Sequence, residues 1–161
     1  MKTSIVIKHF SELTPTQLYD LLELRQEVFV VEQKCIYMDC DGLNDREGSH
    51  ILIYDDNILA AYARLLPTGL SYKNEASIGR IITKITHRGT GLGKVLMDNA
   101  MEYIYDHFNT KEIRISAQCY AIAFYQKCGF EPIGEEYMED DIPHTNMITS
   151  EVQDKNYYIE H

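Results

Sequence analysis

The sequence feature that most constrains the fold of this chain is a glycine-rich loop. It lies between a strand-like run and a helix with one apolar face. Residues 81–85 are rich in β-branched side chains, and residues 92–104 carry apolar side chains at three- and four-residue spacing. Between them lie Gly89, Gly91 and Gly93. Glycine has no Cβ to keep a phosphate away from backbone amides, and a helix N-terminus offers unbonded N–H groups and partial positive charge. The loop is therefore predicted to bind phosphate or pyrophosphate, with a ligand-free βα turn as the alternative.

The spacing of the glycines narrows the choice of phosphate ligand. A dinucleotide fingerprint would need its third glycine where Lys94 stands, and a P-loop would need Ser or Thr in place of Val95 and Gly in place of Arg88. The pattern present is R-x-x-G-x-G, formed by Arg88, Gly91 and Gly93. It resembles the acyl-CoA pyrophosphate loop of the GNAT superfamily of N-acyltransferases, in which Gln or Arg takes the first position.

This resemblance implies a binding site for acyl-CoA. In that family the pantetheine arm pairs with backbone groups of the strand before the loop, and the loop amides hold the pyrophosphate. The positions that match in this chain are Ile81, Ile82, Thr83, Arg88, Gly89, Thr90, Gly91, Leu92, Gly93 and Lys94.

A second motif follows the strand-like run at residues 112–116. Tyr125, Gly129 and Phe130 match the family pattern Y-x-x-x-G-F, with Gly129 as the stop of a short helix. The resemblance implies that the Tyr125 hydroxyl lies near the CoA sulfur and protonates the departing thiolate. Many members carry Asn seven residues before this tyrosine, where this chain has Gln118, which we assign to the cofactor site. The alternative is a buried tyrosine that only packs the short helix.

The resemblance extends over nearly the whole chain and points to the ElaA-like branch of GNAT. The runs that carry it are residues 24–33, 61–67, 78–80 and 139–144. It implies an α/β fold of the α+β mixed-sheet kind, in which a central, mostly antiparallel sheet contains one splayed parallel strand pair and has flanking helices. We expect a single domain over residues 1–161, with residues 153–161 as a C-terminal tail.

Local patterns predict the elements of this fold in order. Thr14 is expected to cap a helix that has Pro15 at its first position and Gln17 as the end of a capping box. The other expected elements are a strand at 4–8, a hairpin at 51–63 that turns at Asp56-Asn57, a strand at 77–85, a helix at 92–104, a strand at 112–116, a short helix ending at Gly129, and a last hairpin of 133–138 and 146–152 around Pro143.

Composition limits the partners and the location of the chain. The formal net charge of −10 argues against nucleic acid. An anionic acyl-CoA would then need a local cationic patch, for which the candidates are Lys84, His87, Arg88, Lys94 and Lys127. Acidity elsewhere favours a cationic amine as acceptor, although solubility explains it equally well.

The chain is predicted to be soluble and cytoplasmic, without a membrane partner. No apolar run approaches the roughly 20 residues of a spanning helix, and charge interrupts the first eight residues too soon for a signal peptide. Four cysteines without a C-x-x-C pair favour reduced thiols and no metal. Residues 156–159 could pack, fray or contribute to a homodimer.

The general base is not evident from the sequence. The resemblance places it on the strand before the glycine loop or in a water chain, and the zone in this chain contains Glu75, Ser77 and Arg80. Alternatives for the general base are Glu32, Asp41, His50 and His144, and Glu32 and His144 are also expected to contact the acceptor. Arg25 could clamp an acceptor carboxylate, but a structural salt bridge is the favoured interpretation.

Two functions are consistent with these motifs. The first is an acyltransferase that moves an acetyl group from acetyl-CoA to a primary amine of a small molecule or peptide, by direct attack in a ternary complex. The second is a non-catalytic acyl-CoA-binding module, which would have no need of Tyr125. A third class, an enzyme acting on nucleotide phosphates, is disfavoured because the glycines fit neither the dinucleotide fingerprint nor the P-loop.

Overall fold

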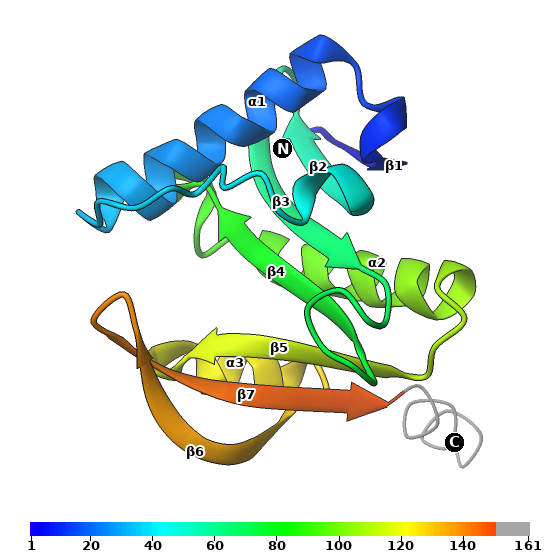
Figure 1. The fold of residues 1–161 in the computed structure, drawn as a ribbon. Helices are drawn as coiled ribbons and strands as arrows, with labels where there is room; N and C mark the ends of the chain where they lie inside the picture. Colours follow the sequence, from blue (N-terminus) through cyan, green and yellow to red (C-terminus); the bar gives the residue numbers. More distant parts are fainter. Residues whose placement is uncertain (151–161) are drawn as a thin grey trace. The chain divides into compact units, whose positions relative to one another are not determined.

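The computed structural model describes residues 1–150, which form two compact units built from interleaved segments. The first unit comprises Met1–Leu66 and Arg80–Ala100, and the second comprises Pro67–Gly79 and residues 101–150. Over the described chain, seven strands follow the hydrogen-bonded order β1-β2-β3-β4-β5-β7-β6 (Figure 1). The β4–β5 pair is parallel, whereas the β1–β2, β2–β3, β5–β7 and β6–β7 pairs are antiparallel. This mixed sheet with flanking helices confirms the predicted fold class.

Three strands form the antiparallel part of the first unit. They are β1 (Thr3–His9), β2 (Ser49–Asp55) and β3 (Ile58–Leu66). The β2–β3 hairpin turns at Asp56-Asn57 as predicted, and Asp56 takes a positive φ of 51° that a short polar residue tolerates. The β3 residues after Ile58 are buried, which places this strand in the core of the unit.

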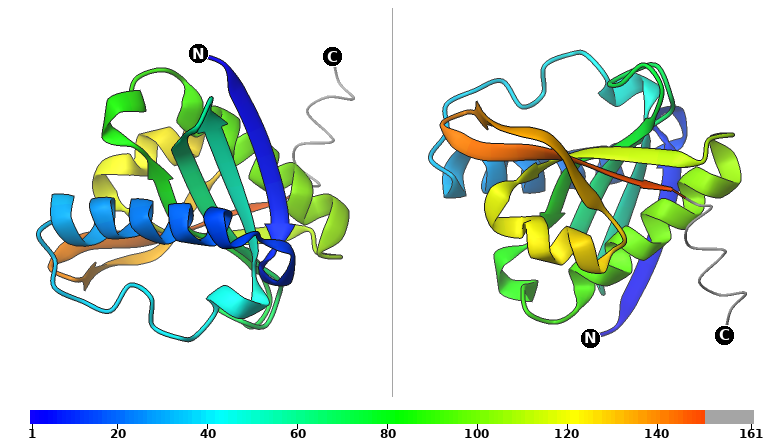
Figure 2. Two further views of the ribbon diagram at one scale, coloured as in Figure 1. Left: turned by 90° about the horizontal axis from the view of Figure 1, so that it is seen from above. Right: turned by 90° about the horizontal axis from the view of Figure 1, so that it is seen from below.

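The first helix, α1 (Pro15–Arg25), begins with the predicted capping box. The Thr14 hydroxyl accepts from the Gln17 amide at 3.1 Å, and the Gln17 side chain accepts from the Thr14 amide at 3.0 Å. Leu21 and Leu24 bury the inner face of the helix against β2 and β3 (Figure 2, left). The chain then continues without a break into a π-helical segment, Gln26–Glu32, a rare geometry that sequence spacing did not indicate.

The strand before the glycine loop ends earlier than the sequence indicates. It is β4 (Ala76–Thr83), and the β-branched run continues into a 3₁₀ turn at Ile85–His87. The prediction that the strand reaches Ile85 is therefore wrong, because the His87 amide donates to the Lys84 carbonyl at 2.8 Å and closes the turn. The following helix, α2 (Leu92–His107), begins where the apolar spacing places it.

The second unit contains the other strands and the short helix. Its elements are β5 (Glu112–Gln118), α3 (Ile122–Lys127), β6 (Glu131–Glu139) and β7 (Ile142–Ser150). The last hairpin does not turn around Pro143, so that prediction is wrong. Asp140 and Asp141 both have positive φ, 51° and 60°, which is the backbone of a type I′ turn. Pro143 lies inside β7, where its missing N–H is tolerated because pairing with β5 begins only at His144.

The short helix α3 ends at Lys127, and Gly129 follows its C-cap as the stop that the sequence predicts. Gly129 has a φ of +100°, and its amide donates to the Gln126 carbonyl at 3.0 Å. The Phe130 amide donates back to the Tyr125 carbonyl at 3.0 Å. These two bonds form a Schellman motif, which fixes Tyr125 within the last turn of α3.

The predicted C-terminal tail at residues 153–161 lies outside the described residues. In the part that is described, none of the helices combines the length and the apolar character that crossing a lipid bilayer requires.

Candidate functional site

Two glycines of the loop adopt left-handed backbone conformations. Gly89 and Gly91 have φ angles of +77° and +83°, and open space surrounds the position of a Cβ at each. The helix α2 begins at Leu92, and the amide of Val95 donates to the Gly91 carbonyl at 3.4 Å. The amides of Leu92 and Gly93 belong to the first turn of α2, ahead of the first hydrogen bond within the helix. They therefore have no helix carbonyl to which they can donate. Such a terminus can accept an anion through its backbone.

Arg88, the first residue of the loop motif, is fixed by two contacts within the first unit. Its Nε donates to the Thr83 carbonyl at 2.9 Å, and its Nη2 lies 2.9 Å from the Glu32 carboxylate. Arg88 thus links the end of β4 to the end of the π-helical segment. Glu32 is the last residue of the π-helical segment, and its carboxylate is paired with Arg88. This is the structural role that the sequence allows as the alternative to a general base.

The expected cationic patch is neutralised by acids of the same unit. Its four members in the first unit lie 2.5 to 2.9 Å from a carboxylate oxygen, in the pairs Lys84–Glu27, His87–Asp55, Arg88–Glu32 and Lys94–Asp98. The hydrogen bond from His87 lowers the pKa of Asp55. The fifth candidate, Lys127, is in the last turn of α3 in the second unit. The lysines and the arginine of the patch in the first unit are thus paired with acids, and the backbone dipole is the main attraction left for an anion.

The parallel pairing of β4 with β5 is short, as a splayed pair requires. It joins Ala76 to Ile113 and Ser77 to Arg114, whereas Ile78 and Gly79 continue β4 without a partner in β5. The next residue of β4, Arg80, takes a left-handed φ of 52°, which is an irregularity within the strand.

Tyr125 is almost fully buried in the second unit, at 9% exposure. Its ring lies edge-on to Phe124 and Phe130, with ring centroids 5.2 and 6.3 Å away. Burial raises the pKa of the Tyr125 phenol, and the nearby Tyr120 and Cys128 raise it further. The phenol therefore keeps its proton at neutral pH. Both roles considered from the sequence, packing residue and proton donor, are compatible with this geometry.

One face of the second unit is polar along three neighbouring strands. In β5, Ile113, Ile115 and Ala117 are buried, while the alternate residues Arg114, Ser116 and Gln118 belong to the opposite face. The register places these three opposite residues of β7, in the pairs Arg114–Ile148, Ser116–Asn146 and Gln118–His144. Gln118 and His144, both predicted from the sequence as site residues, are thus direct neighbours.

Arg114 anchors one end of this polar face. Its guanidinium lies 4.5 Å from the centre of the Tyr72 ring, and its Nη1 is 4.0 Å from the Glu75 carboxylate. Burial raises the pKa of Tyr72, and the neighbouring Tyr137 and Glu139 add to this effect. Glu75, a candidate base, is therefore engaged in an ion pair.

The β6–β7 hairpin supplies the other end of the face. The Tyr137 and Ser116 hydroxyls form a hydrogen bond, and Ser116 also donates to Glu139 at 3.4 Å. Tyr137 stacks on the His144 ring, with centroids 6.0 Å apart and planes 25° apart. His144 Nδ1 lies 2.7 Å from the Ile142 carbonyl oxygen, and its Nε2 lies 3.6 Å from Glu139.

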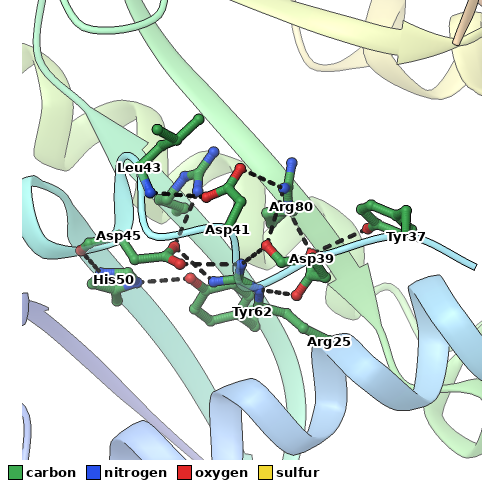
Figure 3. Close-up of polar contacts among 10 residues, drawn as sticks. Arg25, Tyr37, Asp39, Asp41, Leu43, Asp45, His50, Tyr62 and Arg80 are labelled. Carbon is green, nitrogen blue, oxygen red and sulfur yellow. Dashed lines mark hydrogen bonds and ion pairs between the residues drawn. The ribbon is translucent and has the colours of Figure 1, made fainter.

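Arg25 lies in a different cluster, the buried ion network of the first unit (Figure 3). Its guanidinium is 0% exposed and donates from Nε to Asp39 at 2.8 Å and from Nη1 to Asp45 at 2.7 Å. Asp39 also binds Arg80 of β4 at 2.7 Å, and Asp45 also binds Arg64 of β3 at 3.0 Å. This is the structural salt bridge that the sequence favoured for Arg25.

The ion network also engages two of the candidate bases. His50 is fully buried, and its Nε2 lies 2.9 Å from the Asp45 carbonyl while its Nδ1 lies 2.7 Å from the Tyr62 hydroxyl. Because a carbonyl can only accept, Nε2 carries the hydrogen and Nδ1 accepts from Tyr62. Burial lowers the pKa of His50. Asp41 accepts the Leu43 amide at 3.0 Å, and its carboxylate is 4.0 Å from Arg80.

Several residues that build these clusters were not singled out from the sequence. They are Asp39, Asp45, Tyr72, Tyr137 and Glu139. The partners in the ion network are 14 to 41 residues apart along the chain, so no local spacing reveals them. For the polar face, the alternation of polar and apolar residues in β5 was an available signal. Among residues 1–150, no group of three or more His, Cys, Asp or Glu side chains is arranged to hold a metal ion.

Comparison with known proteins identifies the family. A model of the acetyltransferase (GNAT) domain matches residues 20–151. The chain belongs to the GNAT acetyltransferase family. Protein ElaA of Escherichia coli is 42% identical over 147 residues, which cover 90% of this chain and 95% of that protein.

Solved structures of GNAT proteins support the same assignment. The crystal structure of E. coli ElaA matches with a TM-score of 0.86 at 39% identity, covering 92% of this chain and all of that one. An acyl-CoA N-acyltransferase from Pseudomonas aeruginosa matches with a TM-score of 0.82 at 39% identity, covering 91% of this chain and 99% of the other. This GNAT chain is therefore similar to ElaA over most of its length, as its sequence motifs predicted.

We expect loss of Asp45 to destabilise the protein, because it would leave Arg25 buried with one carboxylate fewer. Breaking a buried ion pair on one side costs about 3 kcal/mol, so Asp45→Asn should lower the free energy of unfolding by that amount at pH 7. Burial opposes ionisation of Asp45, but the hydrogen bonds and charges of Arg25 and Arg64 outweigh it and lower its pKa. The contribution of the carboxylate is thus complete above the unfolded pKa of about 4 and is lost as the pH falls through the folded pKa.

Urea unfolding at pH 7 and at successively lower pH measures this effect. The difference between wild type and Asp45→Asn should shrink in acid. The matched control is Asp41→Asn, whose partially exposed partner Arg80 lies at 4.0 Å, and it should cost less than about 1 kcal/mol. Equal losses in the two variants would contradict the importance of the buried network.

Proposed function

We propose that this GNAT protein transfers an acetyl group from acetyl-CoA to a primary amine of a small molecule or peptide. The observation that carries the proposal is the loop from Arg88 to Lys94, with two left-handed glycines in open space and the start of α2 directly behind them. Family membership supports acyl transfer as the chemistry. The proposed CoA pyrophosphate would bind the amides of this loop, and pantetheine would pair with the backbone of residues 81–83.

We propose direct attack of the amine on the thioester rather than transfer through the enzyme. Cys119 is the cysteine next to the end of β5, and a hydrogen bond to Glu136 raises the pKa of its thiol to about 11. The thiol is therefore protonated at neutral pH, and a protonated thiol is a poor nucleophile. This supports a ternary complex in which both substrates are bound together.

Tyr125 is the proposed general acid. Departure of CoA as a thiolate is helped by a proton donor, and the raised pKa of the buried Tyr125 phenol keeps it protonated. The match to the family motif and the Schellman motif, which fixes this residue in the last turn of α3, both support the role.

The first prediction tests the loop. Gly91→Val should lower the affinity for CoA at least about tenfold, about 1.4 kcal/mol, because a branched Cβ would stand in the open space before the amides. Isothermal titration calorimetry with CoA measures the change. The control is Gly69→Val, which places the same side chain at a φ of +97° in open space outside the loop motif. Unchanged affinity in Gly91→Val would contradict the assignment of the loop.

The second prediction concerns the pair that neutralises Arg88. Glu32→Gln should strengthen CoA binding about two- to threefold at low salt, since removal of the exposed partner leaves the Arg88 charge for the phosphates. Turnover should persist. Glu23→Gln, which removes the same charge from the exposed face of α1, is the control. A turnover number reduced about 100-fold would instead identify Glu32 as the base.

The third prediction tests Tyr125. Tyr125→Phe keeps the ring and its packing, so CoA affinity and melting temperature should stay within error of wild type. The turnover number should fall at least about tenfold, because only the proton donor is lost. Release of CoA from acetyl-CoA in an amine screen provides the assay. Tyr103→Phe, in α2, serves as the control. Normal turnover with reduced stability would show that Tyr125 is only a packing residue.

A further inference from the structure

His144 is held in one tautomer by its own hairpin. It lies in β7 at 8% exposure, and its Nδ1 is 2.7 Å from the Ile142 carbonyl oxygen. A carbonyl oxygen can only accept a hydrogen bond, so Nδ1 carries the hydrogen and donates it. In the neutral ring, Nε2 then bears the lone pair. The backbone therefore sets Nε2 as the basic nitrogen of this side chain.

One carboxylate lies close to Nε2 of His144. The Glu139 carboxylate lies 3.6 Å away, and a lone pair cannot donate to it, so the neutral ring leaves Nε2 available. Once Nε2 is protonated, the same contact becomes an ion pair, which stabilises the imidazolium. Ser116 donates to Glu139 at 3.4 Å and contacts Tyr137, which stacks on the His144 ring.

The polar face around His144 also suits a cation. Glu139 exposes 55% of its side chain, and its carboxylate and the Tyr137 ring both attract ammonium groups. The groups that face His144 come from each neighbouring strand: Gln118 of β5, and Tyr137 and Glu139 of β6. Glu139 is the one acid in contact with the ring among those described.

We propose that His144 is the general base that deprotonates the acceptor, and that Glu139 stabilises the resulting imidazolium. The acceptor class is then a primary amine that is cationic at neutral pH. This inference rests on the acyl transfer proposed above and names the substrate class and base of that reaction.

The proton and electron balance of the step is complete. The ammonium gives one proton to His144 Nε2, and the nitrogen lone pair then forms the C–N bond to the acetyl carbon. The C–S electron pair leaves with the sulfur of CoA. Of the two protons that the nitrogen loses, one replaces the proton that Tyr125 gives to the sulfur, and the other passes from His144 to solvent.

Two small amines of nearly the same shape test this role. Ethylamine is an ammonium ion at neutral pH and needs a base, whereas methoxyamine is already unprotonated there. The variant is His144→Asn, because its side-chain amide can still donate to the Ile142 carbonyl but has no basic nitrogen. We expect kcat/KM for ethylamine to fall about 100-fold and that for methoxyamine to change less than about threefold. An equal loss with both amines would overturn the proposal, because it would indicate a structural role.

Three further variants make the test specific. Glu139→Gln should lower kcat/KM about tenfold for ethylamine only, and it also serves if His144→Asn does not fold. Asp140→Asn, which removes a charge from the same turn, should leave both amines unaffected. Tyr125→Phe should affect both amines alike, because it acts at the sulfur. If the wild-type protein binds CoA but acetylates neither these amines nor others, the proposed acyl transfer is overturned. If His144→Asn lowers kcat/KM for methoxyamine only, the role of His144 as the base is overturned and acyl transfer is not.

Discussion

The buried guanidinium of Arg25 is the interaction on which the first unit depends. A charge with no exposed surface would be very costly unless its hydrogen bonds were satisfied, and Arg25 donates to two carboxylates and to the Asp39 carbonyl. Through those acids it links the end of α1 to Arg64 of β3 and Arg80 of β4. The left-handed Arg80 lies in β4 just before the residues proposed to pair with pantetheine. The ion pairs of this buried arginine therefore help to hold the strand that leads into the glycine loop.

The proposed anion would meet paired side chains and free backbone amides at the glycine loop. Each basic side chain near the loop in the first unit is paired with an acid, so the loop presents no excess of side-chain charge. The amides at the start of α2 keep their partial positive charge whatever the net charge of −10. Backbone recognition of this kind depends on glycine conformation rather than on basic residues, which is consistent with the open, left-handed Gly89 and Gly91.

Local patterns predicted the elements, while long-range contacts decided the roles of side chains. The capping box at Thr14, the stop at Gly129 and the order of strands and helices were all predictable, since each depends on neighbours in sequence. The turn of the last hairpin was misplaced, because two aspartates adopt left-handed angles that Asn or Gly more commonly supplies. The partners of Arg25, Arg88 and His144 could not be predicted, because sheet register and segments distant in sequence bring them together.

His50 and His144, the two histidines among the candidate bases, show how the structure separates such candidates. Each points one ring nitrogen at a backbone carbonyl, so each has a fixed tautomer. The second nitrogen of His50 accepts from the buried Tyr62 hydroxyl, which satisfies the ring and leaves no lone pair for a substrate. The second nitrogen of His144 faces a carboxylate, which cannot donate to it in the ionised state. His50 thus has both ring nitrogens hydrogen-bonded within the fold. His144 forms an ion pair with Glu139 only when its Nε2 takes up a proton.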